Sequence, residues 1–237
     1  MMKPILCAAL LILSTGALAD RPVLAVAEFT NEATGATWWR SGVGTELSGM
    51  LTNELAAINA FTVVERSQLD RVLDEQDLGA SGRVRPDTAA EIGELTGAGY
   101  LVTGTVTDYS EETRRTRGGI SIGGRGRSLG IGGESTEAYI AVDIRVINAT
   151  TGEIAHVRTV EGRTQDGGVS LRARQGRFGG NLDHASDTPA GEAIRAALIE
   201  ITDYLECEMV LQTSACRAKY EDRESTRRER ARDAIRF

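Results

Sequence analysis

The chain has only two histidines, three cysteines and four prolines in 237 residues, and aromatic residues make up 5% of it. Such a small stock of histidine and cysteine leaves no cluster with metal-ligand spacing. Asp183, His184 and Ser186 are neighbours in the sequence, whereas a catalytic triad is normally assembled from separate segments. The glycine-rich run 123–133 has neither a G-x-G-x-x-G pattern nor a lysine, so it does not predict a phosphate-binding loop. We therefore expect a protein that is not an enzyme and needs no cofactor and no metal.

Long apolar runs are also scarce. The one clear run covers residues 5–13, follows Lys3 and precedes the small-residue site Ala17-Leu18-Ala19, which is typical of a secretory signal peptide. This predicts a signal peptide at 1–19, a mature chain from Asp20, and export to the periplasm or outer membrane. No other stretch approaches the roughly 18 apolar residues of a membrane helix, so a membrane role would have to come from β-structure.

Positive charge is scarce overall but concentrated in one region. The formal net charge is -7, yet residues 114–177 hold eleven arginines against six acidic residues. This pattern fits an anionic contact or a positively lined cavity, and equally a solvated arginine-rich surface. The cluster lacks interleaved aromatic residues, and the exported location also argues against nucleic acid as a partner.

Two cysteines remain after signal cleavage, Cys207 and Cys216. An oxidising compartment and an even count favour a disulfide with a structural role. On one continuous helix a nine-residue separation would span roughly 13 Å, which is beyond disulfide reach. The bond therefore requires the chain to turn near residues 212–214.

The hydrophobic pattern predicts alternating strands and helices. Strands are expected at 23–29, 61–65 and 100–109, and an antiparallel pair at 139–148 and 154–163. Helices are expected at 41–58 and to begin at 67, at 87 and at 188. The helix that begins at 67 would have Ser67 as its cap and Leu69, Val72 and Leu73 on its apolar side. The last carries a buried stripe of Ala190, Ile194, Ala197, Leu198, Ile201 and Leu205. Together they predict an α/β (α+β) fold, a mixed sheet packed with helices and a long C-terminal helix.

Four sequence blocks in fixed order resemble the curli secretion channel family, the CsgG-like proteins, with relatives in holdfast anchoring. The blocks are VLAVAEFTN (23–31), VVERSQLDRVLDEQDLGASGRV (63–84), IGELTGAGYLVTGTVTDY (92–109) and IAVDIRVINATTGEI (140–154). The resemblance implies a periplasmic αβ domain, a homo-oligomeric ring and two β-hairpins per protomer that join one outer-membrane β-barrel. It also implies that the loop after the first strand narrows the channel through which a secreted protein passes.

The two hairpin arms would fall at about 113–136 and 164–186, and each is long enough for two spanning strands and a turn. In the first arm the apolar residues share one face on either side of a Gly-Arg-Gly tip, and in the second they alternate with serine and arginine, as in a barrel wall with a wet lumen. The membrane-facing candidates are Ile120, Ile122, Leu129, Ile131, Val169 and Leu171, and the basic residues facing a lumen or partner are Arg125, Arg127, Arg172 and Arg174. Glycine content alone would equally fit two flexible loops.

Trp38 and Trp39 occupy the loop after the first strand. In a ring they could bring many indoles to the axis as a pore constriction. Alternatively, they could pack on the first turn of the following helix as a hydrophobic staple.

Two departures from the family pattern leave two hypotheses open. The chain has no lipid-attachment cysteine after its apolar run, and the loop with the two tryptophans looks short. The first hypothesis is an outer-membrane secretion or assembly component that exports protein or polymer through a pore. The second is a soluble periplasmic module of the same fold that contacts a cell-envelope partner. In both, we expect the αβ domain at 20–220 and a charged tail at 221–237.

Overall fold

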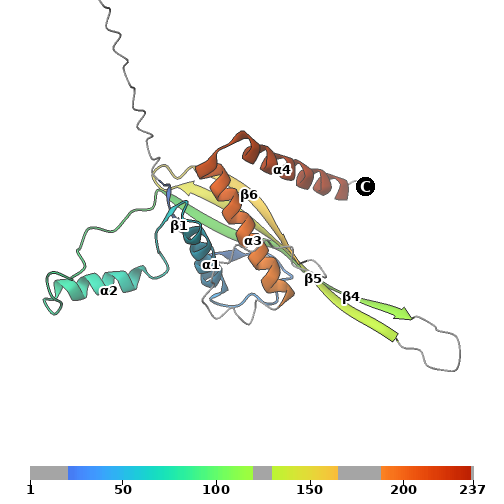
Figure 1. Cartoon of the computed structure of the whole chain (residues 1–237), viewed down its shortest axis with the longest axis horizontal. Helices are drawn as coiled ribbons and strands as arrows, with labels where there is room; N and C mark the ends of the chain where they lie inside the picture. The colour runs from blue at the N-terminus through green and yellow to red at the C-terminus, as the bar shows by residue number, and fades with distance from the viewer. Residues whose placement is uncertain (1–20, 120–129, 165–187, 236–237) are drawn as a thin grey trace, which may run out of the picture.

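The computed structural model describes residues 21–119, 130–164 and 188–235, and its framework is one mixed six-stranded sheet. The strand order is β3-β1-β4-β5-β6, with the short β2 beside β4. β1 runs parallel to β3 and β4, whereas β4, β5 and β6 are antiparallel (Figure 1). The bounds are β1 Val23–Val26, β2 Thr30–Asn31, β3 Thr62–Val63, β4 Tyr100–Gly119, β5 Gly130–Asn148 and β6 Ile154–Arg163.

Two helices build the core on one face of this sheet. They are α1 (Val43–Ala57) and α3 (Pro189–Glu206). Leu24, Val102 and Ile144 from the strands are fully buried together with Leu51 of α1 and Ile201 of α3. Every member of the predicted stripe of α3 is buried except the half-buried Ala190. The predicted mixed sheet with packed helices is therefore confirmed.

Helix α3 approaches the sheet closely enough to require glycine at one position. A Cβ on Gly162 of β6 would lie 2.9 Å from the Ala197 nitrogen and even closer to the Ala193 carbonyl. Thr188 caps the helix by accepting from the Gly191 amide at 3.1 Å, and Pro189 follows at the first helical position, where its missing N–H costs nothing.

The region between β3 and β4 differs from the sequence prediction. Helix α2 (Leu69–Ala80) forms, but Ser67 does not cap it: the Ser67 amide and hydroxyl both donate to Glu65. No helix follows at 87–96, where Gly93 has a φ of 94°. The apolar side of α2 also faces outward, with Val72 39% and Leu73 40% exposed. Periodicity identified an amphipathic helix but could not show that none of the residues described by the structure covers its apolar side.

The C-terminal part turns back on itself after α3. A π-helical turn (Cys207–Leu211) ends at Gln212, whose φ is 49°, and α4 (Ser214–Ala234) begins after the Thr213 cap. This bend brings Cys207 and Cys216 into a disulfide with their Cα atoms 5.8 Å apart. Among the helices that the structure describes, none is both long and apolar enough to cross a membrane.

Candidate functional site: the projecting ribbon and its base

Strands β4 and β5 continue well beyond the sheet as a two-stranded ribbon. β1 and β2 pair with β4 only as far as Val106, and the last residue of β5 paired with β6 is Tyr139. The ribbon, defined here as residues 111–119 and 130–138, is paired from Glu111↔Ala138 to Gly119↔Gly130. Figure 1 shows this ribbon projecting from the body. At about 3.4 Å per residue its nine pairs span roughly 30 Å.

The ribbon leaves the sheet at a β-bulge. The register of β4 shifts between Val106 and Asp108, and a bulge bends a strand and strengthens its twist. Beyond it, the Thr113 and Thr136 hydroxyls are 3.1 Å apart and share a hydrogen bond across the pair.

The loop that carries the two tryptophans is fixed at this bulge. The amides of Glu32 and Ala33 both donate to the Val106 carbonyl, at 2.8 and 3.2 Å. A Cβ on Gly35 would lie only 2.6 Å from the Tyr109 carbonyl, so the loop lies directly against β4. Its conformation is thus tied to the start of the ribbon.

Trp38, Trp39 and Tyr109 form an aromatic cluster at the ribbon base. Trp38 lies edge-on to Tyr109, with ring centroids 5.6 Å apart, and 5.7 Å from Trp39. Burial raises the pKa of Tyr109, and its 2.9 Å hydrogen bond to Glu111 adds to the effect, so the hydroxyl stays protonated. Trp38 Nε1 is buried with no hydrogen-bond partner among the described residues.

Trp39 occupies a different environment from Trp38. It lines a surface hollow of about 630 Å³ together with Arg40, Gly42 and Gly44 at the start of α1. Both indoles are half-buried against the core. Trp39 therefore lies beside the start of α1, whereas Trp38 packs against Tyr109 of β4. Their role as a pore constriction stays a prediction.

The described residues on either side of the second predicted arm lie near the base of the ribbon. The Thr164 amide donates to the Ala138 carbonyl at 2.9 Å, and its hydroxyl accepts from the Ala138 amide at 2.7 Å. The chain therefore leaves β6 next to the ribbon base. It returns at α3, whose first turns pack on Gly162 two residues away.

Most of the predicted arm residues lie outside the described part of the chain. Ile131 is the exception: it belongs to β5 and pairs with Gly118. Cys207 and Cys216 lie at the corner between α3 and α4. The residues outside the description are Ile120, Ile122, Leu129, Val169, Leu171, Arg125, Arg127, Arg172 and Arg174.

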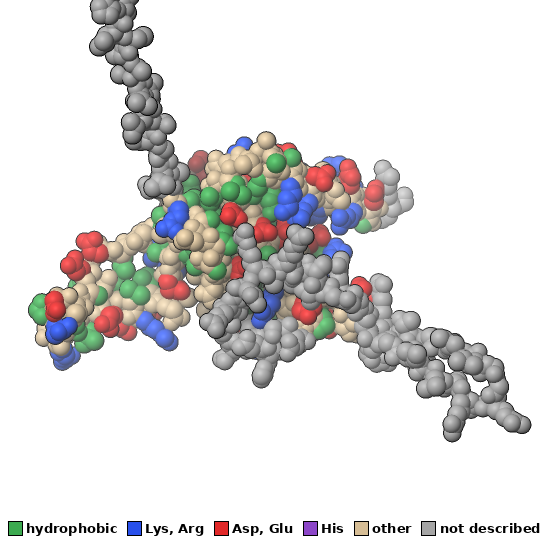
Figure 2. All heavy atoms as spheres, in the orientation of Figure 1, with side chains coloured by type: hydrophobic (Ala, Val, Ile, Leu, Met, Phe, Trp, Pro, Cys, Tyr) green, Lys and Arg blue, Asp and Glu red, His purple; other side chains and the backbone are tan. Residues whose placement is uncertain are grey.

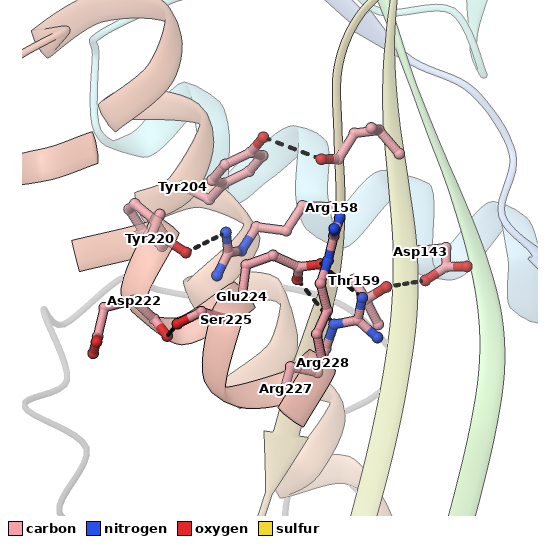
Figure 3. A network of polar contacts seen from close by, with 11 residues as sticks. Asp143, Arg158, Thr159, Tyr204, Tyr220, Asp222, Glu224, Ser225, Arg227 and Arg228 are labelled. Atoms are coloured by element: carbon pink, nitrogen blue, oxygen red, sulfur yellow. Dashed lines mark hydrogen bonds and ion pairs between the residues drawn. The ribbon is translucent and has the colours of Figure 1, made fainter. Parts of the chain in front are cut away.

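A second polar site joins α4 to the sheet, and little in the sequence indicates it. The rings of Tyr204 and Tyr220 are in edge contact, with centroids 5.2 Å apart. The Arg158 guanidinium lies against both rings, 5.3 and 4.9 Å from their centroids, and donates to the Tyr220 carbonyl at 2.8 Å (Figure 3). Burial raises the pKa of Tyr204 to about 12 and also raises that of Tyr220. Tyr220 is the one aromatic residue in α4, and a single aromatic residue in so charged a helix is the sequence signal that could have identified this contact.

Beside this contact, a cleft of about 510 Å³ runs between β6 and α4. Hydrogen bonds from Arg227 and Arg228 lower the pKa of Glu224 to about 2. Arg223 pairs with Glu200, and Arg230 is 4.0 Å from Glu161. Arg223 thus links α4 to α3, whereas the pairs of Glu224 with Arg227 and Arg228 lie within α4 itself. In the described residues no three metal-ligating side chains come together.

The fold and the ribbon define the class as an α/β domain with a projecting β-arm. Residues 8–235 match the family model described as curli production assembly/transport component CsgG, so the chain belongs to the CsgG family.

Individual relatives are more distant than the family match. A putative lipoprotein of Neisseria meningitidis serogroup B is 29% identical over 114 residues, which are 48% of this chain and 44% of that protein. The match thus spans less than half of the relative.

Among solved structures, the hypothetical protein CT253 of Chlamydia trachomatis is 13% identical with a TM-score of 0.45, covering 81% of this chain and 99% of that one. A PelC dodecamer from Paraburkholderia phytofirmans is 12% identical with a TM-score of 0.34, covering 77% and 84%.

Proposed function

We propose that the chain is an exported secretion or assembly component of the cell envelope, a homo-oligomeric ring whose arms form a β-barrel pore for protein or polymer. Membership of a family described as an assembly and transport component, over residues 8–235, is the observation that carries the proposal. The ribbon supplies the structural element that such a pore requires, because its nine paired residues per strand match the 9 to 11 of a membrane-spanning strand.

The register of the ribbon assigns charged positions to both of its faces. Alternate positions of a pleated strand belong to opposite faces. With Arg115 opposite Glu134 and Gly118 opposite Ile131, positions Arg115, Arg117 and Glu134 share one face, while Arg114 shares the other with Gly118 and Ile131. The first face suits the wet lumen of a barrel, and only the outer part of the second, from Thr116 on, is uncharged as a lipid-facing surface requires.

The second arm would add the remaining two strands of each protomer. The described ends of residues 165–187 lie next to the ribbon base, through Thr164 at one end and the start of α3 at the other. A hairpin needs exactly such neighbouring ends. In a ring, the two neighbouring hairpins of each subunit can then pair with those of the adjacent subunits and close one barrel.

A second candidate is a periplasmic module of the same fold that contacts an envelope partner without forming a pore. It is favoured by residues 111–119 of β4, which include no aliphatic or aromatic side chain. A ribbon of this composition is equally suited to contact a partner in aqueous solution.

Membrane fractionation and planar-bilayer conductance of an arm-deleted variant separate these candidates. Residues 114–135 are replaced by Asn-Gly, which joins the paired Thr113 and Thr136 through a favoured hairpin turn. We expect the full chain to enter the membrane fraction and to conduct, and the variant to fold, stay in the soluble fraction and not conduct. A full chain found only as a soluble periplasmic protein would overturn the pore and leave the second candidate.

A further inference from the structure

Strand β6 lies at an edge of the sheet, and half of its backbone groups point away from β5. Thr164 and Ala138 face each other as a hydrogen-bonded pair, since the Thr164 amide donates to the Ala138 carbonyl. In an antiparallel pair of strands, such residues alternate with residues whose N–H and C=O point outward. In the observed register, the outward-pointing residues of β6 therefore include Glu161 and Thr159.

The outward-pointing groups of β6 lack backbone partners among the described residues. The amides of Thr159 and Glu161 make no hydrogen bond to a described residue outside the sheet. Two residues further along, the Tyr204 hydroxyl of α3 reaches the Val157 carbonyl at 3.5 Å, which agrees with the outward direction of this edge. Unpaired donors and acceptors along an edge strand are a template for a further strand.

The cleft of about 510 Å³ beside α4 opens onto this edge. Residues from both faces of β6 line it: Arg158 and Val160 belong to the face that packs on α3, and Thr159 and Glu161 belong to the opposite face. A hollow that both faces of a strand line must lie along the edge of that strand. The opposite wall is formed by the α4 residues Asp222, Arg223, Thr226, Arg227 and Arg230.

Two arginines of this cleft have donors to spare for a ligand. Arg158 is half-buried and fixed by two tyrosine rings, and it forms no ion pair with a described residue. A guanidinium has five N–H donors, of which the Tyr220 carbonyl accepts one. Arg230 is 64% exposed and lies 4.0 Å from Glu161, which is beyond hydrogen-bond distance. Figure 2 shows basic and acidic side chains side by side along α4.

We propose that the cleft binds an extended peptide with carboxylate side chains, which pairs with the edge of β6 and places its carboxylates against Arg158 and Arg230. The edge selects an extended polypeptide, because its donors and acceptors repeat with the spacing of a strand. The arginines select carboxylates, because a guanidinium can donate to both carboxylate oxygens at once. The lining residues include four arginines against three acidic residues, which also favours an anionic partner. This site does not depend on the proposed pore.

Fluorescence anisotropy of the full chain with a labelled peptide of repeated Thr-Asp-Asp units tests the site. Such a peptide carries aspartate on both faces of a strand. We expect it to bind, and Arg230→Gln to weaken its binding about tenfold through the loss of a charge-assisted hydrogen bond. A peptide of repeated Thr-Asn-Asn units should bind more weakly and respond to neither variant.

Arg232→Gln is the matched control variant. Arg232 is exposed on the same helix but does not line the cleft, so its substitution should leave binding unchanged. Because both arginines are exposed, both variants should fold, which circular dichroism checks.

Hydrogen exchange of the wild type then locates the bound peptide. We expect the aspartate peptide to slow exchange at the Thr159 and Glu161 amides and to leave α2 unchanged. No binding, equal binding to wild type and Arg230→Gln, or binding without protection of β6 would overturn the proposal. Protection of both amides before peptide is added would show that this chain or a second copy already occupies the edge, which would overturn it as well.

Discussion

Gly162 is the position where the body of the molecule tolerates no side chain. Its neighbours in α3 are backbone atoms of Ala193 and Ala197, which cannot rotate away. We expect Gly162→Ala to lower the free energy of unfolding by about 3 kcal/mol, since overpacking forces a backbone shift. Urea denaturation measures the change.

Gly49→Ala is the matched control for this substitution. Gly49 lies inside α1 with nothing within 4 Å of an added Cβ, so alanine should stabilise by up to about 1 kcal/mol through helix propensity. Equal effects of the two substitutions would contradict the close packing of α3.

Arg158 holds α4 through two rings and one carbonyl. We expect Arg158→Ala to cost about 2 kcal/mol of unfolding free energy, because a partly buried cation–π pair and a charge-assisted hydrogen bond are lost together. Arg145→Ala, at an exposed position of β5, should cost less than about 0.5 kcal/mol. If chemical denaturation gives the same small loss for both, the Tyr204–Arg158–Tyr220 contact does not hold the helix.

Glu224 makes helix α4 sensitive to acid, because its partners Arg227 and Arg228 lie on the same helix. Its pKa is lowered to about 2 in the folded protein, so its contribution is fully present above its ordinary value of 4.5 and is lost as the pH falls from there toward 2. Because the group is partly solvent-screened, we expect Glu224→Gln to cost only about 1 kcal/mol at neutral pH, and the difference from wild type to vanish near pH 2.

Thermal unfolding across this pH range measures the difference. Glu229→Gln is the control, since Glu229 is on the same helix and forms no ion pair among the described residues. A difference between wild type and Glu224→Gln that does not change with pH would contradict the ion pairs of Arg227 and Arg228.

At the scale of elements, the disulfide and the Arg158 contact fix the corner between α3 and α4. Cys207 and Cys216 close a short loop, for which the chain-entropy estimate is about 2 to 3 kcal/mol. We expect the double substitution Cys207→Ser and Cys216→Ser to lower stability by this amount and to speed hydrogen exchange in α4 more than in α1. Uniform exchange in the two helices would show that the bond does not hold the corner.

Strand and helix patterns in the sequence were strongest where residues face the core. Ile140, Val142, Ile144 and Val146 alternate with polar residues, and all four are buried as predicted. The stripe of α3 is equally clear. In these elements, burial on one face is encoded locally, so periodicity alone identifies both the element and the face that packs.

The prediction was wrong or incomplete where contacts are non-local. The sequence predicted an apolar side for α2 but could not show that Val72 and Leu73 on it are exposed. Residues 221–235 of the predicted charged tail are mostly exposed, but their charge pattern did not reveal that Arg158 and Tyr220 hold the start of α4. The ribbon was expected only from the family resemblance, because its glycine and arginine content also fits a loop. The surface on which a helix packs depends on residues far away in the sequence, and the periodicity of the helix itself carries no information about them.

At the scale of the whole molecule, each distinctive feature lies away from the central core. The ribbon projects about 30 Å from one end of the sheet, and the apolar side of α2 is exposed at a separate position. A protomer with a projecting ribbon and an exposed apolar helix side is suited to the assembly that we propose. A ring places every ribbon on the same side, where arms from neighbouring protomers can pair.

Electron microscopy of the detergent-extracted full chain tests this account most directly. The account predicts closed rings with the ribbons gathered into a tube on one face. Particles that are single protomers, with no ring in any detergent that keeps the chain folded, would contradict it.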